Sequence, residues 1–337
     1  MKKILTGLKP TGEITLGNYI GAIQQMVKLQ DQYDSYLFVA DLHALTIPQD
    51  PEEIHDRIKR FIAMYIACGI DPKKNTIYIQ SENEFIPAMS FLLECTTSYG
   101  EASRMIQFKE KSKQNSNFSV GLLTYPVLMA ADILYCDCDL VPVGIDQKQH
   151  VELARNIAER FNHRYGETFV LPEPLVSTGG TKIRDLKNPT KKMSKSEDNP
   201  QGVISMYDAP EVIIKKIMRA TTDNDNCIKY DMENKPGISN LLNIASVISG
   251  ISIEELEKMF EGKGYGEFKK YVAGITAQHI TMIQERYNQL INSEEIDKIL
   301  SDGIQKSRLL AYNKYELMKN RMGITRKELE QTDKKKR

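Results

Sequence analysis

The sequence predicts an α/β fold, with a doubly wound parallel sheet in the first part of the chain and an all-helical C-terminal domain after it. Three observations favour this class. Short apolar runs alternate with helical periods as far as about residue 161, which is typical of a parallel sheet covered on both faces. A glycine-bearing loop joins the first apolar run to the first helix, as in nucleotide-binding units. From Asp208 to Met322 the period is almost entirely helical.

The first part of the chain is expected to hold strands at residues 4–8, 36–40, 76–80 and 140–143. Helices are expected at about residues 19–32, 51–68, 87–99, 101–113, 119–135 and 148–161. The run Asp50-Pro51-Glu52-Glu53 is a helix start, with an N-cap, a proline at the first position and a glutamate at the third. Because ligands bind at the carboxyl ends of parallel strands, the polar residues 41–43 after the second strand are expected near a ligand.

The later part of the chain contains further helix starts. They are Asp208-Ala209-Pro210-Glu211 and the capping box Ser252-Ile253-Glu254-Glu255. Breaks are expected near Gly237, Gly250 and residues 262–264. A separate helical domain is therefore predicted to begin near residues 199–208, and the basic tail 334–337 is predicted to be disordered.

Composition limits the class of protein. A chain of 337 residues allows two domains, and its formal net charge of zero means that any nucleic-acid contact must use local patches. The five cysteines are scattered, which suits reduced thiols in a cytoplasmic protein. Cys136-Asp137-Cys138 lacks further metal donors, so no metal ligands are predicted. No signal peptide is recognised, and no apolar run is long enough for a membrane span.

Residues 191–196 place three lysines and two serines between Pro189 and Pro200. A helix would have to fit between two breakers, so a loop is expected. Lysines bind phosphate as point charges, and serine hydroxyls add donors. The alternative is a solvated basic loop.

The loop Thr15-Leu16-Gly17-Asn18 is the second phosphate-type segment. Gly17 lacks a Cβ, so a ligand can approach the backbone, and Asn18 lies where a helix begins. The alternative is an N-capped helix after a turn. Together with Lys192-Met193-Ser194-Lys195-Ser196, this loop resembles the two signatures of class I aminoacyl-tRNA synthetases. The second signature is matched letter for letter, and the first has Thr15 and Asn18 in place of two histidines.

Tyr125, Met129 and Asp132 share one face of an otherwise apolar helix. The alternative role for Asp132 is a local cap or ion pair, with Met129 filling a gap. Given the two signatures, a carboxylate at the bottom of an apolar pocket suits the N–H of a flat aromatic substrate such as an indole. A carboxylate left unpaired by an analogue without that donor would reject it.

At this point the resemblance narrows to the bacterial tryptophanyl-tRNA synthetases and covers nearly the whole chain. It rests on Gly7, Pro10 and Gly12 and on blocks at residues 122–134, 141–150, 189–196 and 235–244. It implies activation of L-tryptophan with ATP, followed by transfer of the tryptophanyl group to tRNA(Trp).

The resemblance also implies the roles of individual residues. Asp132 would accept the indole N–H, and the tryptophan site would be completed by Met129, Ile133, Gly7, His43, Tyr125 and Gln147. The ATP site would be formed by Lys9, Pro10, Thr11, Gly17, Asn18, Gly144, Ile145, Asp146, Ile183, Lys192, Met193, Ser194, Lys195 and Ser196. The catalytic residues would be Lys111, Lys192, Lys195, Thr15 and Asn18. Mg²⁺ would be carried by the ATP phosphates.

Two departures and two alternatives accompany the resemblance. An aromatic residue is expected in place of Leu5, and a glutamine in place of Lys9. A tyrosyl-tRNA synthetase would share the fold, but it would want a second polar partner for a phenol, which Leu5, Met129 and Ile133 do not provide. An inactive synthetase-like regulator would keep the fold without needing Lys192, Lys195 or Asp132.

The resemblance finally implies the domains and partners. Residues 1–198 would form the Rossmann-like catalytic domain, with a dimer-interface insertion at about 81–115 and the lysine loop at 192–196. Residues 199–292 would bind the anticodon, residues 293–330 would pack back toward the catalytic domain, and 331–337 would be a tail. A homodimer is expected, consistent with surplus apolar residues between Glu84 and Ser103, namely Phe85, Ile86, Met89, Phe91, Leu92 and Leu93.

Overall fold

The computed structural model describes residues 1–114, 118–176, 181–194 and 199–326. Its strands are β1 (Lys3–Leu8), β2 (Asp34–Val39), β3 (Asn75–Ile79), β4 (Leu140–Val143) and β5 (Glu173–Val176). They form a five-stranded sheet in the order β3-β2-β1-β4-β5. The pairs β2–β3, β1–β4 and β4–β5 are parallel, with Leu37 opposite Ile77 and Val141 opposite Pro174. This order is that of a doubly wound α/β sheet, so the predicted class is confirmed.

The chain divides into two compact units. Unit 1 comprises Met1, Thr6–Ile79 and Ser177–Gly303, and unit 2 comprises Lys2–Leu5, Gln80–Val176 and Ile304–Arg337. Strand β1 and helix α14 (Glu295–Met322) contribute residues to both units.

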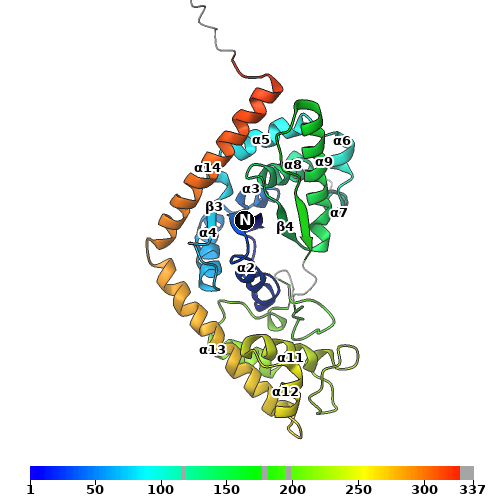
Figure 1. Cartoon of the computed structure of the whole chain (residues 1–337). Helices are drawn as coiled ribbons and strands as arrows, with labels where there is room; N and C mark the ends of the chain where they lie inside the picture. The colour runs from blue at the N-terminus through cyan, green and yellow to red at the C-terminus, as the bar shows by residue number, and fades with distance from the viewer. Residues whose placement is uncertain (115–117, 177–180, 195–198, 327–337) are drawn as a thin grey trace, which may run out of the picture. The chain divides into compact units, whose positions relative to one another are not determined.

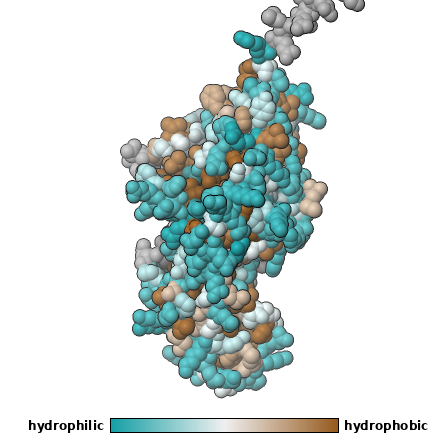
Figure 2. All heavy atoms as spheres, turned by 90° about the vertical axis from the view of Figure 1, so that its left-hand side faces the viewer, coloured by the Kyte–Doolittle hydropathy of each residue, from teal (hydrophilic) through white to brown (hydrophobic). Residues whose placement is uncertain are grey.

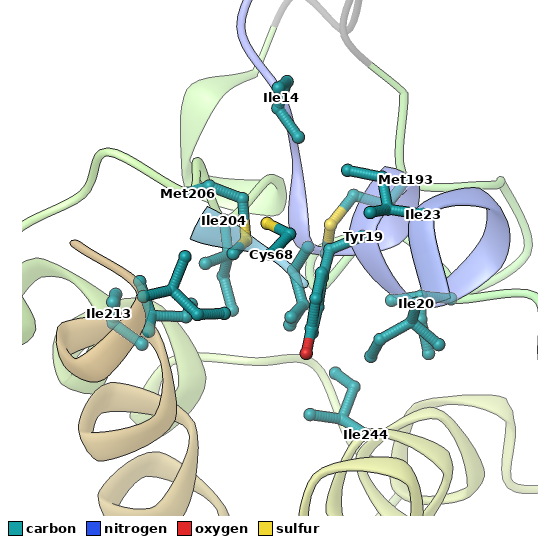
Figure 3. Close-up of a cluster of buried hydrophobic side chains, with 14 of the residues drawn as sticks. Ile14, Tyr19, Ile20, Ile23, Cys68, Met193, Ile204, Met206, Ile213 and Ile244 are labelled. Atoms are coloured by element: carbon teal, nitrogen blue, oxygen red, sulfur yellow. The ribbon is translucent and has the colours of Figure 1, made fainter. Parts of the chain in front are cut away.

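Unit 1 holds the helices α1 (Leu16–Asn18), α2 (Gln24–Leu29), α3 (Asp41–Ala44), α4 (Pro51–Ala67), α10 (Pro210–Met218), α11 (Pro236–Ser249), α12 (Ile253–Met259) and α13 (Tyr265–Ile291). The long helix α13 packs against α4, α10 and α11, and Figure 1 shows α11 and α12 beside it. One hydrophobic cluster joins these helices to the residues after β1. Figure 3 shows part of it, with Tyr19 lying between Met193 and Ile244.

Unit 2 holds α5 (Phe85–Glu94), α6 (Tyr99–Ser103), α7 (Ile106–Gln114), α8 (Val120–Leu134) and α9 (Lys148–Tyr165), which lie around β4 in Figure 1. Helix α8 packs against α5 and α9. The C-terminal part of α14 is tied to this unit by polar contacts. Ser307 accepts a hydrogen bond from Asn83 at 2.8 Å, and Lys314 donates to Asp137 at 2.5 Å.

The starts of α4 and α12 confirm the capping motifs predicted at Asp50 and Ser252. The Asp50 carboxylate accepts the N–H groups of Glu52 and Glu53, and Ser252 and Glu255 form the expected capping box. Gly250 ends α11 in the left-handed conformation, with φ of 74°, which favours glycine.

Three local predictions were incomplete. Strand β5 was not predicted, because it has four residues, includes Pro174 and lies at a sheet edge. The helix expected at 101–113 is broken into α6 and α7, since the Gln149 side chain accepts the N–H of Ile106 and caps a new helix there. The helix expected from Tyr19 begins as α1 and continues as a π-helix over Tyr19–Ile23, which sequence period does not reveal.

Among the described residues, no single helix is long and apolar enough to cross a membrane. The pair α11 and α12 meets that length and hydropathy only together, across a bend of 106°. On the face shown in Figure 2, hydrophilic side chains predominate and hydrophobic ones lie scattered between them.

Candidate active site

The loop Thr15–Asn18 folds on itself as a capping box. Thr15 Oγ1 accepts the N–H of Asn18 at 3.1 Å, and Asn18 Oδ1 accepts the N–H of Thr15 at 3.1 Å. The loop is also held from outside, because Thr15 forms an antiparallel bridge with Ser205 and Leu16 donates its N–H to Ile204. The sequence-based alternative of a capped helix start therefore describes the local structure correctly, and it fixes the backbone to which Gly17 belongs.

Gly17 brings the two signature segments together within unit 1. A Cβ built on Gly17 would lie 3.2 Å from both Cβ and O of Met193. A side chain at this position would push Met193 outward by a few tenths of an ångström, so glycine favours the close packing of the two segments. Met193 is completely buried, as is Ile183 at 1% exposure.

Residues 183–193 form a hairpin. Met193 donates its N–H to Ile183 O, Asp185 donates to Lys191 O, and Arg184 bridges Lys192 in antiparallel fashion. The side chain of Lys192 is exposed, and Ser194 is half-buried. The hairpin thus presents Lys192 on a fixed backbone; Lys195 and Ser196 lie outside the described residues.

The turn after β1 carries the next candidates in unit 1. Thr11 donates its N–H to Lys9 O at 2.9 Å, Pro10 is buried, and Gly12 has φ of 65°, which favours glycine. A Cβ on Gly7 would lie 2.7 Å from the Phe38 ring, so glycine is required where that ring covers the strand. His43 belongs to α3, at the carboxyl end of β2 as expected.

In unit 2, Asp132 is completely buried on α8. Gln80, which is also completely buried, donates its Nε2 amide to both Asp132 carboxylate oxygens, at 2.8 and 2.9 Å. A buried carboxylate is stable only with such donors. Gln80 is the first residue after β3, so the carboxylate on α8 is oriented from the carboxyl end of a parallel strand.

Tyr125 lies on the same face of α8 as Asp132. Its Oη is 2.7 Å from Nε2 of His150, and the centroids of the two rings are 5.4 Å apart. Burial raises the pKa of the Tyr125 phenol to about 12, so the hydroxyl keeps its proton at neutral pH. Met129 is half-buried and Ile133 is 1% exposed. Gln147 is the residue before α9, one turn ahead of His150.

The turn after β4 carries the remaining candidates. Gly144 accepts the N–H of Gln147 at 3.0 Å, and Ile145 is 81% exposed. The side chains of Asp146 and Lys111 lie outside what the structure describes. Lys111 belongs to α7, whose start is capped by Gln149.

The candidate residues divide between the two units. Unit 1 contains a loop site, made of the turn after β1, Thr15–Asn18 and the hairpin. Unit 2 contains a helix site, made of α8 and the residues that orient it. Two residues of the helix site, Gln80 and His150, were missed by sequence reasoning. Gln80 could have been found as the first polar residue after a strand, whereas His150 gave no signal apart from its position in a recognised block.

The chemistry of each site follows from its groups. The loop site offers backbone N–H groups, hydroxyls and an exposed ammonium, which suit phosphate oxygens. The helix site offers a buried carboxylate and a phenol among apolar side chains, which suits a flat apolar ligand with one N–H donor. Among the described residues, no three His, Cys, Asp or Glu side chains gather as a metal site.

Comparison with known proteins shows which family the chain resembles. The family model described as tRNA synthetases class I (W and Y) matches residues 1–281. A tryptophan--tRNA ligase of Bacillus anthracis is 47% identical over 97% of the chain and 99% of its own length. The crystal structure of a tryptophanyl-tRNA synthetase from Mycoplasma pneumoniae is similar with a TM-score of 0.84 and 35% identity, covering 96% of this chain and 98% of that one. A Campylobacter jejuni tryptophanyl-tRNA synthetase complexed with ADP and tryptophan also has a TM-score of 0.84 and 35% identity, covering 95% and 99%.

Proposed function

The chain belongs to the class I tRNA synthetases of the tryptophan and tyrosine type and, among them, to the tryptophan--tRNA ligases, and on this basis we propose the roles of its residues. It activates L-tryptophan with ATP and transfers the tryptophanyl group to tRNA. ATP and tryptophan as substrates are supported by the Campylobacter jejuni relative, which was crystallised with ADP and tryptophan.

In the first step, a carboxylate oxygen of tryptophan attacks the α-phosphorus of ATP. The bond from that phosphorus to the bridging oxygen of the β-phosphate breaks, and pyrophosphate leaves with the electron pair. Positioning and positive charge matter most for such a displacement. We assign the charge to Lys192, Lys195 and Lys111, and the positioning of the nucleotide to Thr15–Asn18.

The other ATP contacts are proposed from the resemblance. The nucleotide would be held by Lys9, Pro10, Thr11, Gly144, Ile145, Asp146, Ile183, Met193, Ser194 and Ser196. Lys9 would make an ionic contact where the family has an amide. The substrate would be MgATP, with Mg²⁺ carried mainly by the phosphates, because Mg²⁺ usually keeps several waters and few protein ligands.

In the second step, a ribose hydroxyl at the end of the tRNA attacks the carbonyl carbon of the adenylate. The ester to tRNA forms as the bond to AMP breaks. The class I pattern makes the 2′-hydroxyl the attacking group.

The observation that carries the choice of tryptophan is the fully buried Asp132, held on both oxygens by Gln80. A carboxylate fixed in this way accepts the indole N–H. Tyr125 and Gln147 would bind the α-amino group of tryptophan, and Met129, Ile133, Gly7 and His43 would surround the ring. Leu5 is buried in β1, and we assign it no role in selection.

We further propose a cytoplasmic homodimer. Four of the apolar residues expected at the interface, Ile86, Met89, Leu92 and Leu93, are buried within unit 2, so the support comes from others. Phe91, Tyr99 and Ile106 are 64%, 73% and 52% exposed along α5 to α7, and exposed large apolar side chains are typical of interfaces. Sedimentation velocity of the wild type and of Phe91→Asp tests the dimer, which the substitution should dissociate.

We also propose that the anticodon is bound by residues 199–292.

Amino-acid-dependent exchange of labelled pyrophosphate into ATP tests the function. Exchange with tryptophan at a far higher kcat/KM than with tyrosine is expected. Equal exchange with both would indicate a tyrosine-type site, and no exchange with either would indicate a regulator without activation chemistry.

A further inference from the structure

The block 235–244 at the start of α11 has no part in the proposed reaction, yet it touches the hairpin that carries Lys192. Its central residue, Asn240, is 1% exposed. Its Oδ1 accepts the backbone N–H of Arg184 at 2.8 Å, and its Nδ2 donates to the backbone carbonyl of Arg184 at 3.0 Å. The Asn240 side-chain amide thereby pairs with the N–H and the carbonyl of Arg184, as the backbone of a neighbouring strand would.

The contact with Asn240 bears on Lys192 because Arg184 is its partner in the hairpin. Arg184 stands opposite Lys192, and the ladder hydrogen bonds on either side of the pair are made by their neighbours. In such a pair the N–H and carbonyl of Arg184 point away from Lys192 and toward the outer edge. Asn240 lies at that edge. The hairpin strand that contains Arg184 is therefore held by Asn240 on one side and by the strand that contains Lys192 on the other.

A second contact supports the same arrangement. Thr221 donates its N–H to Leu186 O at 2.8 Å, and α11 begins directly against Thr221. A Cβ on Gly237 would lie 2.1 Å from Thr221 O, so glycine is needed for that approach. The hairpin strand is therefore attached to α11 at Arg184 directly and at Leu186 through Thr221.

Hydrophobic packing completes the connection. Ile244 of α11 and Met193 of the hairpin belong to one buried cluster with Tyr19, as Figure 3 shows. Met193 in turn fills the space over Gly17. A shift of α11 would thus move the backbone of Lys192 relative to the loop Thr15–Asn18.

We propose that Asn240 is a positioning residue for adenylate formation, which sets the place of Lys192 through the backbone of Arg184. The proposal rests on the proposed function of the hairpin as a phosphate-binding element. It gives the helical region after residue 208 a direct mechanical link to the lysine hairpin. Asn240 acts on the rate of activation, and the binding of tryptophan does not depend on it.

The test measures tryptophan-dependent pyrophosphate exchange in Asn240→Ala and Asn240→Asp. Asn240→Asp keeps the shape of the side chain and an acceptor for the Arg184 N–H, but it places an oxygen against the Arg184 carbonyl. Because the strand opposite Lys192 loses its hydrogen bonds to α11, kcat should fall about tenfold or more in each variant, with the KM for tryptophan unchanged. Thermal unfolding monitored by circular dichroism, run in parallel, gives the folded fraction.

Asn243→Ala is the matched control. Asn243 lies on the same helix and is 8% exposed, and its side chain makes no hydrogen bond to another described residue. It should keep wild-type kcat. If Asn240→Ala and Asn243→Ala lose stability alike and both retain kcat per folded molecule, Asn240 is only structural and the proposal is wrong.

A double variant distinguishes positioning from an independent effect. If Asn240 acts through Lys192, adding Asn240→Ala to Lys192→Ala should lower kcat little beyond Lys192→Ala alone. Full multiplication of the two effects would overturn the proposal. Failure of the proposed function would look different, because the wild type itself would then show no tryptophan-dependent exchange.

Discussion

Gln80 binds Asp132 through a single nitrogen that donates to both carboxylate oxygens, at 2.8 and 2.9 Å, with neither residue exposed. A carboxylate only accepts hydrogen bonds, so the Gln80 amide must turn its NH₂ group toward it. The other end of that amide, Oε1, is buried without a hydrogen-bond partner among the described atoms. The orientation of Asp132 is thus maintained while one buried carbonyl oxygen stays unsatisfied, which is uncommon in folded proteins and is explained here by the need to hold the carboxylate.

Gln80→Met should weaken tryptophan binding. Removing the donor leaves the buried carboxylate short of a partner, at about 1–3 kcal/mol, so the KM for tryptophan should rise about five- to hundredfold while kcat changes less. Steady-state pyrophosphate exchange measures both constants.

Gln30→Met is the control for that substitution. Gln30 is a 7% exposed glutamine whose Oε1 accepts hydrogen bonds from Asp71 and Asn75 in unit 1. The variant should lose stability and keep its tryptophan KM. A tryptophan KM unchanged in Gln80→Met would show that Asp132 needs no orientation by Gln80.

Lys195→Ala should lower the rate of activation far more than it changes tryptophan binding, because we propose that its ammonium stabilises charge that develops on the phosphates. A loss of about 10²–10³ in kcat is expected for one such group. Lys191→Ala, which removes an exposed neighbouring lysine, should be nearly silent. A rise in tryptophan KM alone would contradict the transition-state role.

Gly303→Ala should destabilise the protein. A Cβ at this position would lie 1.8 Å from Ile77 O, so α14 would have to move away from β3, at about 1–3 kcal/mol. Gly274→Ala, on α13 with open space around it, should instead stabilise by about 0.5–1 kcal/mol. Urea unfolding followed by circular dichroism compares them, and equal midpoints would contradict the packing described.

His279→Gln should reduce the pH dependence of stability. Burial lowers the pKa of His279, whose Nε2 lies 2.8 Å from the Tyr19 hydroxyl. Since the unfolded chain then takes up a proton at higher pH than the folded one, this contribution is present above about pH 6.5 and is lost as pH falls through the folded pKa. Unfolding free energies at pH 7.5 and at about pH 5.5 should differ less in His279→Gln than in the wild type. His163→Gln, at an exposed position, should retain the wild-type difference.

Local signals predicted most of the fold. The strands followed from apolar runs, and the caps at Asp50 and Ser252 followed from residues within one turn of each other. These features depend on neighbours in sequence, so sequence period and composition reveal them. Strand β5 and the π-helix at Tyr19–Ile23 depend on what the backbone packs against, which the local sequence does not encode.

The candidate site was predictable to the same extent. Asp132 and the lysine loop were proposed from residue type and spacing together with the family resemblance, whereas the residues that hold them in place were not proposed. Gln80 is 52 residues from Asp132, and Asn240 is 56 residues from Arg184. Such long-range hydrogen bonds are decided by tertiary packing, and an amide side chain gives no sign in the sequence of which partner it will meet.

Whether Asp132 accepts the indole N–H is measured by the ratio of kcat/KM for tryptophan to kcat/KM for its benzothiophene analogue, in which sulfur replaces the N–H. A site built to accept that N–H should discriminate against the analogue by at least about 10²-fold, with 10⁴–10⁵ as the upper range for such sites. Asp132→Asn should bring the ratio toward one. A ratio near one in the wild type would show that Asp132 does not accept the indole N–H.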